Sequence, residues 1–364
     1  MAREVRCVLA MAPGWCAILA WVSCRAPNRL EDTGHGLSSE TGVEAGVEAG
    51  VEAGASGRAE CPDDMVHVRA DYCPSVERTC TLVEHDDNNH LEICHAFAHE
   101  QRCRVQAQPM SFCIDRYEYP NRKSEHPARM VTWYQAQATC EAYGKRLCWA
   151  REWTAACEGP EGSPFPYGWE RNPLACNMDN LYIKPNLADA GREFLFYSKD
   201  RTVALLELSR LDRSVASGSM ESCRSGFGVY DLTGNVDEWV VSDQPPRGRS
   251  KWAGLKGGGW GHVRSQCRAM TVSHDPGFAY YSIGFRCCRD VADASDGART
   301  PAPQAMRPPD VPAHDFVPES VPVVGAPGPS QTKYDWREDE RRRARVARAA
   351  ATATDSESVP NPYE

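Results

Sequence analysis

Residues 127–159 read PARMVTWYQAQATCEAYGKRLCWAREWTAACEG and hold the two clearest helical patterns of the chain. From Thr132 to Tyr143, apolar residues recur at helical spacing, and Gly144 is placed to end that helix. A second short helix is expected from Trp149 to Ala156. These helices give the sequence two local anchors around which the rest of the fold can be inferred.

Strand patterns come before this segment, and turns dominate after it. Residues 65–68 (MVHV) and 112–119 (FCIDRYEY) read as strands. Beyond residue 159 the glycines fall in turn-like clusters between short apolar runs. Early helices followed by irregular β structure predict an α+β fold rather than a parallel sheet.

Cysteine usage predicts an oxidising compartment. The chain of 364 residues contains 17 cysteines and no Cys-x-x-Cys pair, and the spacings match no zinc module. The formal net charge of −9 and the lack of a basic, aromatic-laced stretch argue against a nucleic-acid partner. We therefore expect an exported, disulfide-rich protein of the periplasm or cell surface.

The N-terminus has the features of an export signal. Arg3 and Arg6 flank the start of a mostly apolar stretch over residues 5–22, so residues 1–24 read as a signal peptide. Pro13 and Gly14 interrupt the stretch, which is too short for a membrane-spanning helix.

Cys24 lies where bacterial lipoproteins carry their lipidated cysteine. If Cys7 and Cys16 leave with the signal peptide and Cys24 carries lipid, 17 − 3 = 14 cysteines stay in the mature chain, an even number. Membrane attachment through a lipidated Cys24 and plain secretion are both kept as alternatives.

Composition divides the rest of the chain into three parts. Residues 25–60 contain Gly-Val-Glu-Ala repeats and are predicted to be a flexible linker. Residues 61–290 form the folded domain, of which residues 61–111 are a cysteine-rich N-terminal part. Residues 291–364 are rich in Pro, Ala and Arg and are predicted to be disordered, with a charged run at 337–348 that suits a short solvated helix.

Six segments of the domain form an ordered series: FCIDRYEYPN (112–121), the segment 127–159, FPYGW (165–169), GFGVYDLTGNVDEW (226–239), LKGGGW (255–260) and IGFR (283–286). This series resembles the formylglycine-generating enzyme family, also called the sulfatase-modifying factor family. The resemblance implies a C-type-lectin-like α+β fold with little regular secondary structure. Four tryptophans are expected in its core, with two glycines allowing close backbone approach, namely Trp133, Trp153, Trp239, Trp260, Gly257 and Gly258.

The resemblance also implies a calcium site in the segment 226–239. Its ligands would come from Asp231, Gly234, Val236 and Glu238, a set of hard oxygen donors that suits Ca²⁺. A second family calcium site would begin at Asn177 and Met178. The alternative is a surface turn held by side-chain hydrogen bonds.

Family enzymes use O₂ and copper(I), held by two cysteines, to convert a client's cysteine to formylglycine. Aligning Gly257–Trp260 on the family motif places His262 and Cys267 at the two copper-ligand positions, so one thiolate is missing. Gly259 stands where the family has Ser. The alternative for Cys267 is a disulfide, with Cys287 or Cys288 as expected partner.

These positions lead to two main hypotheses. The first is a non-catalytic, calcium-stabilised binding or scaffolding module for an exported protein or glycan. The second is a copper-dependent formylglycine-generating oxidase, or a divergent oxidoreductase, acting on a cysteine of an exported client. A cell-envelope structural protein is a third alternative.

A histidine-rich segment at residues 85–99 offers a different metal hypothesis. His95 and His99 are four residues apart, which on a helix is a zinc-binding spacing. Three cysteines bracket the segment, which favours a disulfide-braced insertion over a metal site.

Overall fold

The computed structural model describes residues 61–86, 90–186, 201–243, 252–291 and 333–356. The predicted signal peptide with Cys24 and the linker at 25–60 lie outside these ranges. None of the described helices is both long enough and apolar enough to cross a membrane.

The largest sheet joins the N-terminal strands to the end of the domain. β1 (Met65–Tyr72) pairs along its whole length with β4 (Gln108–Asp115), which in turn pairs with β9 (Cys287–Asp290). The two-residue strand β5 (Arg146–Leu147) completes this antiparallel sheet on the far side of β9. Strands whose paired residues are about 175 positions apart in the chain therefore lie side by side.

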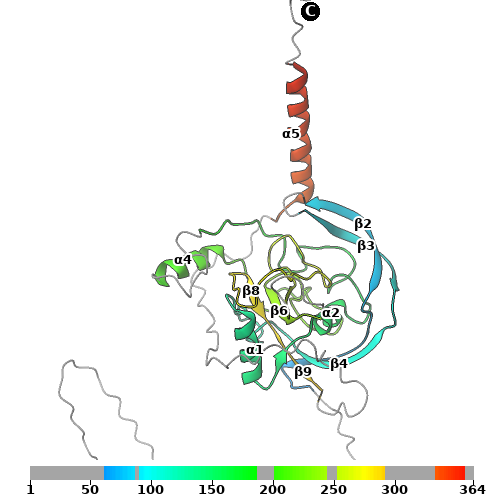
Figure 1. Cartoon of the computed structure of the whole chain (residues 1–364), viewed down its shortest axis with the longest axis vertical. Helices are drawn as coiled ribbons and strands as arrows, with labels where there is room; N and C mark the ends of the chain where they lie inside the picture. The colour runs from blue at the N-terminus through cyan, green and yellow to red at the C-terminus, as the bar shows by residue number, and fades with distance from the viewer. Residues whose placement is uncertain (1–60, 87–89, 187–200, 244–251, 292–332, 357–364) are drawn as a thin grey trace, which may run out of the picture. The chain divides into compact units, whose positions relative to one another are not determined.

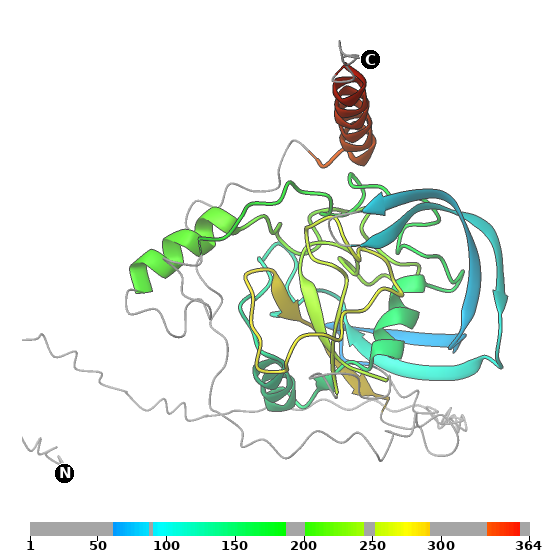
Figure 2. The ribbon, with the colours of Figure 1, turned by 45° about the horizontal axis from the view of Figure 1, so that its top comes forward.

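A long hairpin and a small central sheet make up the remaining strands. β2 (Val76–Asp86) and β3 (Leu91–Cys103) form a two-stranded ribbon that curves along one side of the domain (Figures 1 and 2). The central sheet has β6 (Asp237–Val241) between antiparallel β7 (Ala253–Lys256) and parallel β8 (Ile283–Phe285).

The two helices predicted within residues 127–159 form close to their expected bounds, whereas a third, α4 (Arg201–Leu211), was not predicted. α1 (Trp133–Ala142) is capped by Thr132, whose hydroxyl accepts from Gln135 N–H while the Gln135 side chain accepts from Thr132 N–H. α2 (Ala150–Glu158) follows β5 after Trp149. α4 lies apart from these two (Figure 1). The α+β prediction is thus confirmed.

Tryptophan and glycine take the structural roles predicted for them. Trp133, Trp153 and Trp239 are fully buried, and Trp260 is nearly so. Gly257 has φ +98°, and a Cβ there would lie 3.3 Å from the Val236 carbonyl oxygen. A larger residue would therefore force the loop away from β6.

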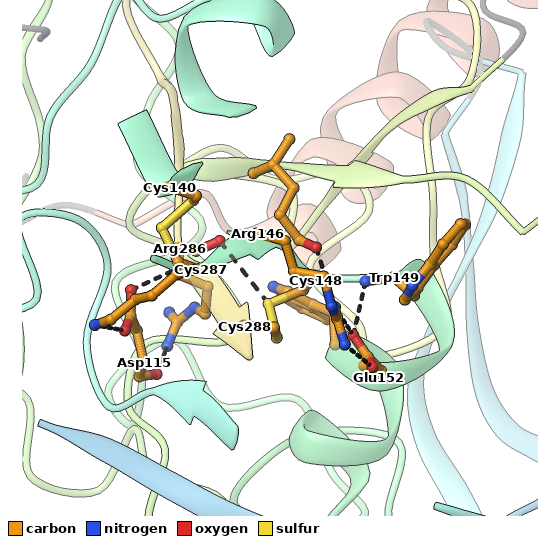
Figure 3. Close-up of a disulfide and its surroundings, with 12 residues drawn as sticks. Asp115, Cys140, Arg146, Cys148, Trp149, Glu152, Arg286, Cys287 and Cys288 are labelled. Carbon is orange, nitrogen blue, oxygen red and sulfur yellow. Dashed lines mark hydrogen bonds and ion pairs between the residues drawn. A yellow bond between two sulfur atoms is a disulfide. The ribbon is translucent and has the colours of Figure 1, made fainter. Parts of the chain in front are cut away.

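Seven disulfides use all fourteen cysteines from Cys61 to Cys288. Two of them start from neighbouring residues of β9, since Cys287 bonds to Cys140 of α1 and Cys288 bonds to Cys148 (Figure 3). Successive residues of a strand point to opposite faces, so one short strand is fixed on both sides. Around these bridges, Arg146 forms a bidentate ion pair with Glu152, and Asp115 accepts from Cys287 N–H (Figure 3).

The C-terminal region differs from the disorder predicted for residues 291–364. Residues 336–356 form the helix α5 (Trp336–Ser356), which is longer than the charged run at 337–348. Its first turn packs on the domain, because Trp336 is buried against His95. The composition of the tail does not predict this aromatic contact, because it depends on a residue of the folded domain.

Candidate functional site

The loop after β7 carries the position that corresponds to the family's first copper ligand. Gly257, Gly258 and Gly259 all have positive φ, at +98°, +77° and +57°. Three such residues in a row turn the chain sharply, which is a conformation that glycine adopts without steric cost. The turn presents Trp260 and His262 to a segment that contains Asp179 and Asn180, through backbone hydrogen bonds of Asp179 N–H to Gly261 and Asn180 N–H to Trp260.

His262 lies between two carboxylates. Its Nδ1 is 2.9 Å from Asp179 Oδ1, and its Nε2 is 2.8 Å from Glu84 Oε2. Asp179 is further held by a bidentate ion pair with Arg171, which also donates to the His262 carbonyl oxygen. Both ring nitrogens of His262 therefore have fixed acidic partners.

The electrostatics of this cluster follow from its burial and its ion pairs. Burial alone would raise the pKa of Glu84, but hydrogen bonds with His262 and His95 outweigh it and lower the pKa to about 2. For Asp179, the charge of Arg171 and the bond with His262 likewise outweigh burial and bring the pKa to about 2. The pKa of His262 is raised, since its two carboxylates outweigh the effect of burial.

His95 of β3 joins the same cluster. Its Nε2 lies 2.7 Å from Glu84 Oε2, the oxygen that also faces His262. The helix considered for His95 and His99 is not formed, because both residues lie on a strand of the β2–β3 hairpin. His99 instead stacks on Trp169 with ring centroids 5.0 Å apart.

The first residue of α5 and the chain just before it cover the two histidines. The Tyr334 ring lies 4.2 Å from the His262 ring, and Trp336 stacks on His95 at 4.6 Å. One backbone and one side-chain hydrogen bond hold this segment in place: Tyr334 N–H donates to the Asp179 carbonyl oxygen, and Lys333 Nζ donates to Asn180 Oδ1 at 3.0 Å.

A cavity of about 610 Å³ opens beside His262. Aromatic and aliphatic side chains form much of its lining, together with a few polar ones; they include Tyr182, Trp260, Tyr281, Tyr334, Leu211 and Arg213. A hollow of this size with apolar walls and few polar groups is typical of a binding site.

The second copper-ligand position has no free thiol. Cys267 is fully buried and bonded to Cys157 of α2, with the two Cα atoms 5.5 Å apart. The prediction that Cys267 bonds to Cys287 or Cys288 is wrong, because both of those residues are bonded to other cysteines. The structure thus brings His262, but not Cys267, to the cavity.

The predicted calcium ligands lie in a buried acidic cluster. Glu238 forms a bidentate ion pair with Arg286, with both N–O distances 2.7 Å, and Glu238 Oε2 also accepts from Trp153 Nε1–H. Asp231 Oδ2 accepts from Gly218 N–H, and burial raises the pKa of Asp231 to about 7. Glu118 adds a third buried carboxylate whose pKa is raised by burial and by its acidic neighbours.

One guanidinium among three buried carboxylates leaves negative charge that a bound cation or a proton would neutralise. This excess fits a calcium ion near Asp231. The two occupied oxygens of Glu238 fit it less well, since a metal would have to share them with Arg286.

The second predicted calcium site, at Asn177 and Met178, is occupied by hydrogen bonds between amide groups. Asn177 Oδ1 accepts from Asn180, and its amide group donates to the Arg213 carbonyl oxygen. Its own carbonyl oxygen accepts from Asn235 N–H. Met178 packs among Cys176 and Cys223. Calcium at both places stays a prediction.

Sequence reasoning missed most members of the histidine cluster. Glu84 belongs to a strand of mixed polarity, and its partner His262 lies 178 positions away. Arg171 and Asp179 fall in a region without periodic pattern. Of the whole set, the sequence marked His95 as part of a histidine-rich segment and His262 as a family position.

Comparison with known proteins places these features in a family. The model of the sulfatase-modifying factor enzyme 1-like domain matches residues 88–291, more than half of the chain. An inactive C-alpha-formylglycine-generating enzyme 2 of Mus musculus is 28% identical over 173 residues, covering 45% of this chain and 49% of that relative. The formylglycine-generating enzyme of Mus musculus is 25% identical over 193 residues, covering 48% of this chain and 47% of that relative.

Two solved structures are similar over most of their own length. CarF is 18% identical with a TM-score of 0.39, covering 63% of this chain and 99% of that one. PvdO from Pseudomonas aeruginosa is 17% identical with a TM-score of 0.35, covering 62% and 94%.

The fold and the loop beside the cavity define a disulfide-rich α+β protein of the formylglycine-generating type. The chain belongs to the sulfatase-modifying factor enzyme 1-like family. It spans about half the length of the formylglycine-generating enzyme relatives it matches.

Proposed function

We propose that this domain is an exported, non-catalytic binding or scaffolding member of its family. The observation that carries the proposal is the Cys157–Cys267 disulfide, which consumes the single cysteine at the family's copper positions. The many disulfides agree with an exported protein. The name of the mouse relative describes that protein as inactive, which supports the same reading here.

The residues present do not fit a copper(I) ion at the family positions. Copper(I) prefers soft thiolate ligands, and a disulfide sulfur is not a thiolate. His262 is an imidazole where the family has a thiolate, so no thiolate is present at either position. No step of the family's oxidation is therefore derived for this chain.

The binding role is supported by the cavity beside His262. Tyr182 is 73% exposed at its edge, and Trp260 and Tyr281 lie deeper within it. Aromatic side chains with polar ends supply contact area at low entropic cost and stack on sugars or apolar side chains. We infer that an exported protein or a glycan occupies this cavity.

The proposal is tested with the oxidised protein, copper(I) and a Cys-x-Pro-x-Arg peptide in air. We expect no copper(I) uptake at the Cys267 position and no conversion of the peptide cysteine to formylglycine by mass spectrometry. The formylglycine-generating enzyme, assayed alongside, serves as the active control.

A matched variant shows whether the two positions explain the result. His262→Cys combined with Cys157→Ala creates two free cysteines at the family spacing, and we expect this variant to gain copper(I) binding. Turnover of the peptide by the unmodified protein would overturn the proposal.

Calcium enters the proposal as a stabilising ion near Asp231. We expect a chelator to lower the melting temperature at pH 8, where Asp231 is ionised, and Asp231→Asn to abolish that sensitivity. Asp290→Asn, whose side chain is 79% exposed, is the matched control.

The excess negative charge near Asp231 could instead be neutralised by a proton, and the melting temperature would then depend on pH rather than on calcium. The folded pKa of Asp231 is raised to about 7, so the folded state binds this proton more tightly than the unfolded chain does. The resulting gain in the free energy of unfolding is complete below about pH 4 and is lost as the pH rises through 7. A melting temperature that falls between pH 5 and pH 8 equally with and without calcium would exclude the ion.

A further inference from the structure

The structure holds a group of three potential metal ligands that lies outside the predicted calcium sites and shares only His262 with the family's copper positions. Glu84, His95 and His262 each offer one ligand atom, and these atoms all lie within 4.8 Å of one another. They come from β2, β3 and the glycine loop, so the fold rather than the local sequence assembles them. We propose that these three residues bind a divalent transition-metal ion, with Zn²⁺ or Fe²⁺ as representative ions.

The kind of ligand decides the class of metal. Two imidazoles and one carboxylate suit zinc, iron, copper or nickel, whereas calcium and magnesium prefer oxygen ligands alone. Two histidines with one carboxylate also leave positions on the ion free for water or another ligand. His262 borders the cavity, from which such a ligand would enter.

An unpartnered oxygen gives independent support. Glu84 is fully buried, and its Oε1 has no hydrogen-bond partner among the described residues, while Oε2 faces both histidines. A buried carboxylate oxygen without a partner costs free energy. A metal ion bound by Glu84 would supply the missing partner.

The surroundings of His262 match those of metal-bound histidines. With Nε2 on the ion, Nδ1–H would donate to Asp179 at the observed distance of 2.9 Å. Histidine ligands usually donate their second nitrogen to a carboxylate in this way, which fixes the tautomer and the ring orientation. Arg171 in turn holds Asp179 in place, so Asp179 is a positioning residue.

Binding requires a small adjustment of the ligands. Glu84 Oε2 lies 2.8 Å from His262 Nε2 and 2.7 Å from His95 Nε2, which are hydrogen-bond distances. Ligands about 2.0–2.1 Å from a tetrahedral zinc are separated by about 3.3 Å. Each histidine nitrogen would therefore move about half an ångström away from Glu84 Oε2, within reach of side-chain rotation.

The test uses the full chain, stripped with a chelator and dialysed. We expect it to take up about one equivalent of Zn²⁺ by elemental analysis, and Co²⁺ in its place to give visible absorption bands of a low-symmetry site. A large excess of Ca²⁺ should not displace either ion, which separates this site from the calcium near Asp231.

Variants assign the ligands. Glu84→Gln and His262→Asn should lose the uptake, and Asp179→Asn should weaken it about 10–100-fold. His85→Asn, a histidine of the same hairpin whose side chain is 65% exposed, should bind normally. Circular dichroism and the mass of the seven-disulfide form show whether each variant folds.

Two outcomes would overturn the site. One is a folded, stripped protein that takes up no Zn²⁺ or Co²⁺ at micromolar concentrations. The other is uptake that persists in both Glu84→Gln and His262→Asn. Neither result bears on the copper assay, so failure here leaves the proposed function standing.

Discussion

At the scale of single residues, the least expected feature is a lysine in the core. Lys256, at the end of β7, is 2% exposed, and its Nζ donates to the Cys267 carbonyl oxygen at 2.7 Å. The ammonium group also lies 5.1 Å from the centre of the Trp153 ring. Burial lowers the pKa of Lys256 to about 7, although acidic neighbours such as Glu158 oppose that shift.

This lysine predicts a measurable dependence of stability on pH. Between pH 7 and pH 10, the unfolded chain keeps the proton that folded Lys256 releases, so this residue makes folding more favourable by up to about 1.4 kcal/mol per pH unit. In Lys256→Met this slope should disappear. The free energy of unfolding of the variant should thus exceed that of the unmodified protein most near pH 6–7, and the difference should shrink toward pH 10.

Denaturant unfolding at several pH values measures this difference, with exposed Lys184→Met as the control. Equal slopes for the Lys256→Met variant and the unmodified protein would mean that Lys256 stays charged in the folded state over this range.

Residue roles could be predicted where a local motif carries them. The buried tryptophans and the glycine loop lie in short segments that resemble family motifs, and that resemblance implies their roles. The cluster of Glu84, Asp179 and His262 could not be predicted, because its members are up to 178 positions apart and meet only when the hairpin folds over the loop. No one-dimensional pattern encodes such contacts.

At the scale of elements, helices were predicted better than strands. α1 and α2 are stabilised by neighbours three and four positions away, which a sequence displays directly. The hairpin β2–β3 depends on pairing between strands and contains register shifts, so its alternation is irregular. On this strand, the four-residue spacing of His95 and His99 has no helical meaning.

The twin bridges on β9 predict a cooperative loss of stability. Cys140 and Cys148 are eight residues apart, and Cys287 and Cys288 are adjacent, so each bridge closes only a short additional loop while the other is present. Replacing either pair by alanine should cost about 2–3 kcal/mol from chain entropy. Replacing both pairs should cost about 7 kcal/mol, roughly 1 kcal/mol more than the sum, because the residual loop to Cys157–Cys267 is then much longer.

Urea unfolding of the two paired variants and the fourfold variant measures these values. Removal of Cys73 and Cys103 is the control, because it involves a separate hairpin bridge. Simple additivity of the two β9 pairs would contradict the shared-loop argument.

At the scale of the whole molecule, the C-terminal segment closes over the cavity. Tyr334 lines the cavity and contacts His262, and Trp336 contacts His95. Aromatic contacts of this kind contribute about 0.5–1.5 kcal/mol each beyond their buried area. These contacts, together with the hydrogen bonds of Lys333 and Tyr334, hold the segment over the cavity.

Removing residues 333–364 should expose the cavity without unfolding the domain. We expect faster hydrogen exchange at the backbone amides of residues 257–266 and little change in the melting temperature. Tyr334→Ala with Trp336→Ala should reproduce the effect, while Arg345→Ala on the exposed part of α5 should not. Unchanged exchange in the truncated chain would show that the segment does not cover this loop.

The pattern of bridges also determines how the domain would come apart after cleavage. Three disulfides join cysteines between Cys61 and Cys113, and four join cysteines between Cys140 and Cys288, with none connecting the two sets. A single protease cut between residues 141 and 286 therefore leaves fragments linked on a non-reducing gel. A cut between residues 114 and 139 severs the sole covalent connection, so the two parts would separate in denaturant without any reductant.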